Sequence, residues 1–271
     1  EEANIRKAIK DINEIFNVID IDDLKRNKEL NFNRYDVFFI LDQLKKIEED
    51  LDITIPYPYN VNIFSHLYIL LSRTRKVPTR LYPDKISEQV LENMKNDILY
   101  PVAKEVIQNI EKYLNSPLPE IEIYFLYQYL VSSRMQGSIA KTSTFSADVV
   151  NVTKTYIEGM SSCLGIELDS QSLFVELANH IKPMLNRLQH NIRVKNSLLS
   201  QIKVTYENVF NAVKKVSEMV SERFNLPEIN DDENGFITLY FAKAIETGQH
   251  LRPIKTLIMC TTGIGTSELL Q

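Results

Sequence analysis

Two stretches of this 271-residue chain repeat one pattern: residues 66–73 read His-Leu-Tyr-Ile-Leu-Leu-Ser-Arg, and residues 180–187 read His-Ile-Lys-Pro-Met-Leu-Asn-Arg. A second pair lies downstream, where residues 122–129 read Glu-Ile-Tyr-Phe-Leu-Tyr-Gln-Tyr and residues 233–240 read Glu-Asn-Gly-Phe-Ile-Thr-Leu-Tyr. The two offsets, 114 and 111 residues, differ only as loop lengths would. The sequence therefore predicts a tandem duplication of a unit of roughly 100 residues.

The pattern of apolar residues around these repeats predicts helices. Apolar side chains recur at spacings of three and four over residues 3–19, 33–52, 60–76, 86–114, 120–135, 146–163, 170–189, 197–224 and 232–247. Pro101 is expected to kink or interrupt the helix over 86–114, and Pro183 to remove one helical hydrogen bond beside His180. Only seven glycines occur, none before residue 137, which argues against a β-sandwich or barrel. We predict an all-α fold of two tandem helical bundles.

Composition and charge narrow the class of protein. The chain is 44% hydrophobic and 25% charged, as globular proteins are, and its formal net charge of −5 argues against nucleic-acid binding by these residues. No apolar run approaches the ~20 residues that span a bilayer, and no signal peptide is recognisable. Two widely separated cysteines, Cys163 and Cys260, indicate a reducing cytoplasm, and Cys163 is expected in the core.

The repeated His and Arg have a possible chemistry in common. Seven residues span two helical turns, so His66 and Arg73 share a helix face, as do His180 and Arg187. A neutral imidazole can accept a phosphoryl group, and a guanidinium can hold phosphate oxygens with paired N–H donors. The competing interpretation is structural: a hydrogen-bonded core or capping histidine followed by a surface arginine.

A different kind of motif ends the chain. Residues 254–260 form a short β-type run that ends at Cys260. In the loop that follows, backbone N–H groups could form an anion cradle beside a thiol of lowered pKa. The phosphate-supporting residues predicted there are Thr261, Thr262, Gly263 and Gly265. A cysteine phosphatase would need Arg where Thr266 stands, and a dinucleotide fingerprint would need Gly where Glu268 stands, so a phosphocysteine carrier fits better than either. A buried structural cysteine is the remaining alternative.

These motifs together resemble a known family. The repeated His-containing units resemble paired phosphotransferase-system (PTS) regulation domains of bacterial transcription activators and antiterminators that respond to sugar transport. The tail over residues 257–270 resembles the start of an enzyme IIB domain, and residues 1–6 are similar to the segment that follows the helix-turn-helix region of multidomain activators. The mannitol and oligo-β-glucoside operon activators are the most similar type.

The resemblance implies roles for individual residues. His66 and His180 match the first phosphoacceptor histidine of each regulation domain, Arg73 and Arg187 the arginine that accompanies it, and Cys260 the phosphoacceptor cysteine. One departure is clear, because Tyr129 and Tyr240 stand near where the family usually has a second histidine. His190 and His250 match no family position; we interpret them as a surface or capping residue and a linker residue.

The resulting prediction is the regulatory core of a sugar-responsive transcriptional regulator, not a metabolic enzyme. Its expected partners are phosphorylated carriers of the HPr and enzyme IIA or IIB type, a second copy of the chain, and DNA through a domain outside it. We expect no membrane contact, catalytic residue, metal or cofactor. The predicted parts are a helical linker (1–28), a first regulation domain (29–138), a second (139–250) and the truncated start of an enzyme IIB-like domain (251–271). The alternatives are an RNA-binding antiterminator and a phosphocarrier subunit of a sugar transporter.

Overall fold

The computed structural model describes residues 33–76, 88–137, 145–168 and 170–248. The chain forms two compact units, Glu1–Lys141 and Thr142–Gln271. The predicted helix over 3–19 and the cysteine loop lie outside the described residues.

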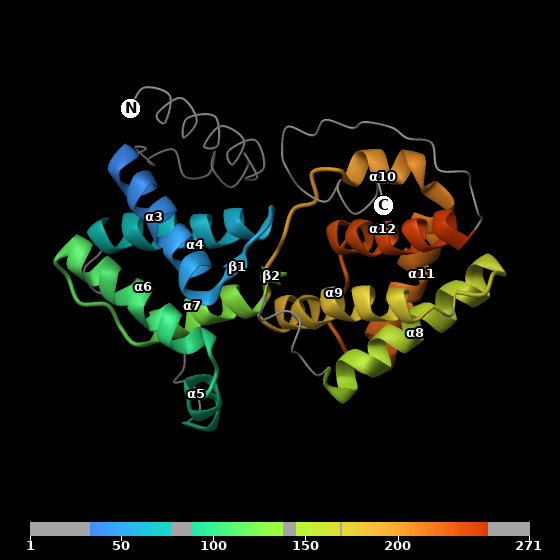
Figure 1. Cartoon of the computed structure of the whole chain (residues 1–271), viewed down its shortest axis with the longest axis horizontal. Helices are drawn as coiled ribbons and strands as arrows, with labels where there is room; N and C mark the ends of the chain where they lie inside the picture. The colour runs from blue at the N-terminus through green and yellow to red at the C-terminus, as the bar shows by residue number, and fades with distance from the viewer. Residues whose placement is uncertain (1–32, 77–87, 138–144, 169, 249–271) are drawn as a thin grey trace. The chain divides into compact units, whose positions relative to one another are not determined.

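The first unit is built from five helices among its described residues (Figure 1). They are α3 (Arg34–Leu51), α4 (Tyr59–Lys76), α5 (Glu88–Lys95), α6 (Leu99–Leu114) and α7 (Ile121–Val131). Two short strands, β1 (Ile53–Thr54) and β2 (Gln136–Gly137), pair antiparallel with Ile53 opposite Gly137. This ladder was not predicted, because two residues are too few to show an alternating pattern.

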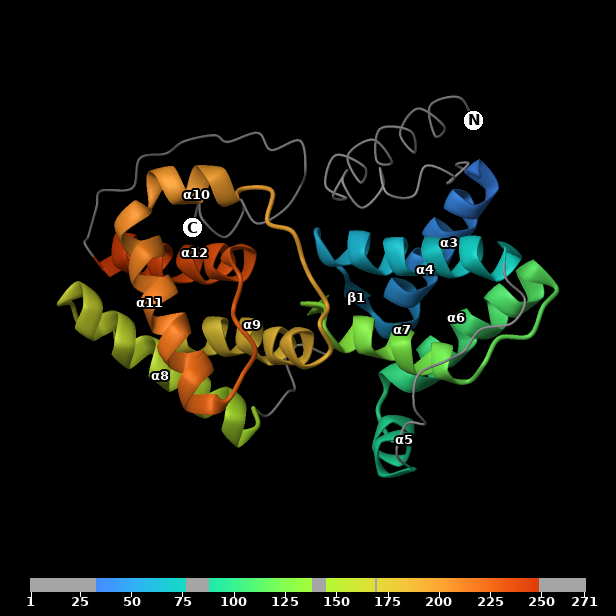
Figure 2. The same cartoon turned by 180° about the vertical axis from the view of Figure 1, so that it is seen from behind.

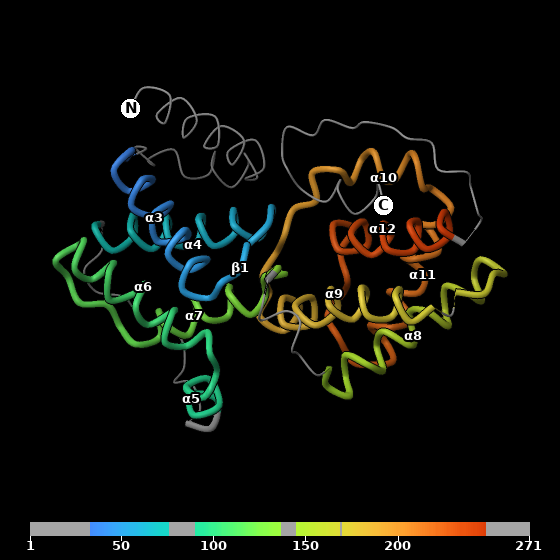
Figure 3. Tube along the Cα trace, in the orientation of Figure 1, coloured from blue at the N-terminus to red at the C-terminus, as the bar shows by residue number. Residues whose placement is uncertain are grey.

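The second unit repeats the order of the first. Its helices are α8 (Ala147–Leu164), α9 (Gln171–Gln189), α10 (Leu199–Thr205), α11 (Glu207–Phe224) and α12 (Asp231–Gly248). Figure 2 shows α11 crossing α8, and Figure 3 traces the path from α9 through α10 and α11 to α12. The predicted all-α class is confirmed. None of the helices in the described ranges is long and apolar enough to cross a membrane.

Side-chain caps explain where several helices begin and end. Asn33 and Ser146 accept hydrogen bonds from first-turn backbone N–H groups of α3 and α8. Left-handed residues terminate α3, α6 and α11 at Asp52, Asn115 and Asn225, with φ of 49°, 48° and 49°. Asp and Asn tolerate this conformation better than most residues, so these helices stop without glycine. The scarcity of glycine is thus compatible with several short helices.

Two predicted long helices are each divided in the structure. The segment 86–114 breaks at residues 96–98, and Pro101 lies in the first turn of α6, where its missing N–H costs no helical bond. The segment 197–224 breaks at Tyr206, whose φ of −120° and ψ of 38° are not helical and whose hydroxyl donates to Glu246 on α12. Apolar periodicity continues across both breaks, which is why it did not locate them. Pro183 lies inside a continuous α9.

Each unit has its own apolar core. In the second unit Tyr156 is fully buried and its hydroxyl is 2.7 Å from Ser217 Oγ. The prediction that Cys163 is a core residue was wrong, since this free thiol is exposed. The buried face of α8 runs through Tyr156 and Met160 to the partly buried Leu164, and Cys163 lies off it. Gly159 permits close packing of α8 on α11, because a Cβ there would meet Val216 Cγ1 at 3.0 Å.

Candidate functional site

The two repeated motifs converge in each unit. In the first, His66 and Arg73 lie on α4, which packs against α7, the helix that carries Glu122 and Tyr129. Arg73 donates from Nη2 to Glu122 Oε1. The His66 ring stacks on the Tyr129 ring with centroids 4.4 Å apart and planes 25° apart. A His–Arg pair from one helix thus meets a Glu–Tyr pair from another.

The environment of His66 keeps its imidazole uncharged. Its Nε2 is buried and has no hydrogen-bond partner among the described residues. Burial, and after it the positive charge of Arg73, lowers the pKa of His66 from 6.5 to about 3. Burial likewise raises the pKa of Tyr129, against the opposing effect of Arg73. At neutral pH the site therefore presents a neutral imidazole beside a guanidinium.

The second unit holds the corresponding residues in a tighter cluster. Arg187 Nε donates to Glu233 Oε1 at 2.6 Å, and its Nη2 donates to Oε2 at 2.8 Å, a bidentate pair between α9 and α12. Both side chains are buried, with Arg187 1% exposed. His180 places Nε2 at 3.5 Å from Glu233 Oε2, and its ring centroid lies 5.4 Å from that of Tyr240.

Glu233 stays ionised inside this cluster. Burial alone would raise its pKa, but the charge of Arg187 and hydrogen bonding by His180 and Arg187 outweigh burial and hold the pKa at about 2. The ion pair is therefore intact at neutral pH. It joins the two helices that carry the repeated motifs.

Sequence reasoning found the four side chains of each site but not their partnership. The carboxylates Glu122 and Glu233 open the second repeated motif, yet no role was predicted for them. Their signal was present, because an acidic residue stands at the same position of the motif in both repeats. Arg73 and Arg187 pair with these carboxylates instead of standing free for phosphate.

Other predicted residues lie elsewhere. His190 is the C-cap of α9, which agrees with the capping interpretation, and burial lowers its pKa. His250, Cys260 and the loop residues Thr261, Thr262, Gly263 and Gly265 are outside the described residues. Within the described ranges, no group of three or more His, Cys, Asp or Glu residues is placed to hold a metal ion.

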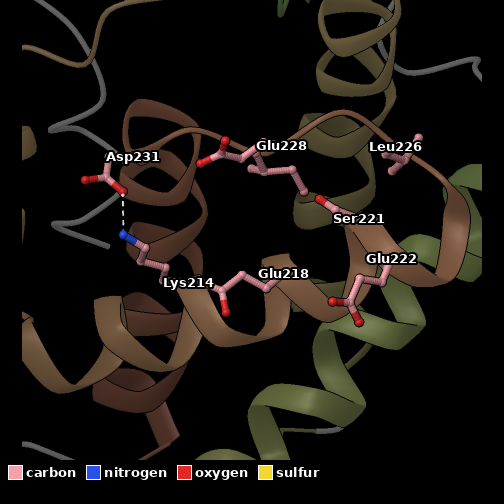
Figure 4. Close-up of a pocket in the computed structure, with 8 residues that line it drawn as sticks. Lys214, Glu218, Ser221, Glu222, Leu226, Glu228 and Asp231 are labelled. Carbon is pink, nitrogen blue, oxygen red and sulfur yellow. Dashed lines mark ion pairs between the residues drawn. The ribbon is translucent and has the colours of Figure 1, made fainter.

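A surface depression of the second unit lies at α11 and the segment before α12 (Figure 4). Four of its lining residues are acidic, and Lys214 Nζ is 3.6 Å from Asp231 Oδ1. The lining residues are Lys214, Glu218, Ser221, Glu222, Leu226, Glu228, Ile229 and Asp231. None of the repeated His, Arg, Glu or Tyr residues is among them. The depression is therefore separate from the residues of the two repeated motifs.

The duplicated helical units and their paired sites define the class. The family model for the PRD domain matches residues 41–133 and 154–244, one match in each unit. The chain belongs to the PRD domain family, as the resemblance to PTS regulation domains indicated.

Several curated proteins are similar to the chain. It is 28% identical over 217 residues to the probable licABCH operon regulator of Bacillus subtilis (strain 168), covering 78% of this chain and 33% of that protein. It is 25% identical over 276 aligned residues to the transcriptional regulator ManR of the same strain, covering 100% of this chain and 41% of ManR. Protein GlcT of Staphylococcus aureus (strain JH9) is 26% identical to the chain over 144 residues, covering 52% of this chain and 49% of GlcT. The chain thus spans a third to a half of the length of these relatives.

Proposed function

We propose that this chain is the regulatory region of a bacterial transcriptional regulator of a sugar operon, controlled by PTS phosphorylation of His66 and His180. The observation that carries the proposal is the neutral imidazole of His66, with its Nε2 buried and Arg73 nearby, inside a PRD unit. Relatives named as an operon regulator and a transcriptional regulator support the same reading.

The chemistry of control is a change of charge in an apolar setting. A phosphoryl group adds about −1.5 to −2 charge at neutral pH. Placed between α4 and α7, or between α9 and α12, it would rearrange the Arg–Glu pairs that join these helices. Such a local change can bias a two-state equilibrium of the whole regulator.

Further parts of the proposal concern the whole protein. Its domains are a first regulation domain over 29–138 and a second over 139–250, preceded by a linker and followed by the start of an enzyme IIB-like domain with Cys260 as acceptor. It acts in the cytoplasm as a homodimer. It contacts DNA through a region outside this chain, which accommodates the net charge of −5.

Phosphotransfer tests the proposal directly. The chain is incubated with labelled phosphoenolpyruvate, enzyme I to transfer its phosphoryl group, and HPr-type and enzyme IIA- or IIB-type carriers, and the labelled residues are mapped. Label is expected on His66 or His180 and is lost in the corresponding His→Ala variants. His190→Ala is the matched control, because His190 caps a helix and should not change the labelling. Absence of label from both His66 and His180 contradicts the proposal. Cys260→Ser tests the cysteine in the same assay.

A further inference from the structure

In both units an aromatic ring from the second repeated motif packs against the histidine of the first. The rings of His66 and Tyr129 are stacked, with centroids 4.4 Å apart and planes 25° apart. At the corresponding position of the second unit, the centroid of the Tyr240 ring lies 5.4 Å from that of His180, with the planes 43° apart. A histidine packed against a tyrosine is therefore a repeated part of the site, and the function proposed above gives the tyrosine no role.

Stacking on Tyr129 restricts the torsion that turns the His66 imidazole. The χ2 torsion of histidine is broad, because it joins an sp³ carbon to an sp² ring. Nε2 of His66 has no hydrogen-bond partner among the described residues, so no polar contact at this nitrogen fixes the ring. The centroid distance of 4.4 Å is at the short end of the range for an attractive stack, and a turned imidazole would lose this contact. Tyr129 thus holds the plane of the His66 ring.

The plane of the ring decides in which direction an imidazole nitrogen can react, because its lone pair lies in that plane. In transfer from a phosphohistidine carrier, the donor P–N bond breaks and its electron pair stays on the donor nitrogen. The new N–P bond forms from the lone pair of the acceptor nitrogen. The proton on the other nitrogen of each ring stays in place, so the step needs no further reactant. An ordered ring plane aims the lone pair along the breaking bond and so favours the reactive geometry.

Tyr129 itself is poorly suited to accept the phosphoryl group. Burial raises the pKa of its hydroxyl, and the opposing effect of the Arg73 charge is smaller. At neutral pH Tyr129 is therefore a protonated phenol, which is a weak nucleophile. The His66 imidazole, whose pKa is lowered to about 3, is neutral at the same pH and has a free lone pair. The contact between the two residues is made by their rings, so we look for the role of Tyr129 in its ring.

We infer that Tyr129 is a positioning residue whose ring orients the imidazole of His66 for phosphoryl transfer from a phosphohistidine carrier. This inference rests on the proposed function and adds to it the residue that sets the geometry of the acceptor. Because the ring carries the role, phenylalanine can replace this tyrosine, whereas an aliphatic side chain cannot.

Initial labelling rates test the inference. His66 is followed alone in the H180A chain, with a phosphorylated HPr-type carrier as donor. Tyr129→Leu keeps an apolar side chain between α4 and α7 but removes the ring, and should lower the His66 rate about tenfold. Tyr129→Phe supplies a ring again and should recover most of the rate lost in Y129L. An unchanged rate in Y129L, or an equal loss in Y129F and Y129L, would overturn the inference.

Tyr127 offers a matched control on the same helix. It is half-buried on α7, and its hydroxyl interacts with Asp97, which precedes α6. Tyr127→Leu therefore removes a ring of the same size that packs elsewhere, and should leave the His66 rate unchanged. A loss in Y127L as large as in Y129L would mean that loosening of α7 causes the effect, and would overturn the inference.

A second measurement reports the stack in the intact chain and needs no variant that could impair folding. The ring current of Tyr129 should shift the NMR signals of the His66 ring protons upfield. The shift should persist in Y129F and disappear in Y129L. Unshifted His66 ring protons in the parent chain would overturn the inference.

The position of the label separates the inference from the proposed function. Phosphohistidine is lost in acid and phosphotyrosine is not, so acid-stable label on Tyr129 would overturn the inference. Label on His180 but not on His66 in the parent chain would overturn it while the proposed function stands for the second unit. Absence of label from both histidines would remove the proposed function and this inference together.

Discussion

At the scale of single residues, His66 makes the first unit sensitive to acid. Its pKa is about 3 in the folded unit and 6.5 in a model peptide. Between these values the unfolded chain binds a proton that the folded chain does not, so stability falls as the pH is lowered through this window. From pH 6.5 to 4.5 the loss is roughly 2–3 kcal/mol.

The change that checks this prediction is His66→Gln, which removes the titrating group. Urea unfolding at pH 7 and at pH 4.5 should show a smaller pH effect in this variant than in the parent chain. The same loss of unfolding free energy in both proteins would mean that His66 does not carry the acid sensitivity.

The two arginines are expected to differ in their contribution to stability. Arg187→Met leaves the Glu233 carboxylate buried and uncompensated, and breaking such a pair costs about 3–5 kcal/mol of unfolding free energy. Arg73→Met should cost less, about 1–3 kcal/mol, because the Arg73 side chain is 22% exposed and solvent weakens its attraction to Glu122. Denaturant titrations of both variants measure the difference.

The double variant Arg187→Met with Glu233→Gln is the control for this comparison. Removing both charges leaves no buried ion, so part of the lost stability should return. A double variant that is as unstable as the sum of the single ones would point to lost packing instead of an unpaired charge.

The sequence was sufficient to predict which residues form the candidate sites, but not which of them pair with each other. The repeat located His66, Arg73 and their counterparts, because duplication leaves a visible offset. It could not show that Arg187 clamps Glu233, since the two residues lie 46 positions apart on different helices.

At the scale of elements, the packing of α8 on α11 depends on a small residue. A Cβ at Gly159 would meet both methyl groups of Val216 and the Met219 Cε at 3.0–3.1 Å. Gly159→Leu should therefore destabilise the second unit by about 1–3 kcal/mol through overpacking. Gly159→Ala should be close to neutral, because its gain in helix propensity, about 1 kcal/mol, offsets the tight contact.

Thermal unfolding of the two variants checks this prediction, with Ser162→Leu as the control. Ser162 is exposed on the same helix and should tolerate the larger side chain with a change within about 0.5 kcal/mol. Similar losses for the Leu substitutions at 159 and 162 would refute a specific contact with α11.

Most helices of the described residues could be predicted from apolar periodicity, and their interruptions could not. A buried stripe continues from α10 into α11, although Tyr206 departs from helical geometry between them. The side chain of Tyr206 reaches Glu246 on α12, a tertiary contact that local sequence does not contain. The same holds for the pairing of β1 with β2, whose strands lie more than eighty residues apart.

At the scale of the whole molecule, the duplication predicts two units that fold separately. Each has its own buried core and its own Arg–Glu pair between the helices that carry the repeated motifs. The main apolar cluster of the second unit is drawn from α8, α9, α11 and α12 and the segments that join them. A unit of this size can be independently stable when it encloses such a core.

Residues 1–141 and 142–271, expressed as separate chains, should each unfold cooperatively on heating. Their far-UV circular dichroism spectra, weighted by length, should sum to the spectrum of the intact chain. The acid sensitivity that depends on His66 should follow the first fragment alone, since its cause, burial beside Arg73, is contained within that unit. If either fragment is unfolded, the units depend on each other for their stability. The same conclusion follows if the His66-dependent acid sensitivity appears only in the intact chain.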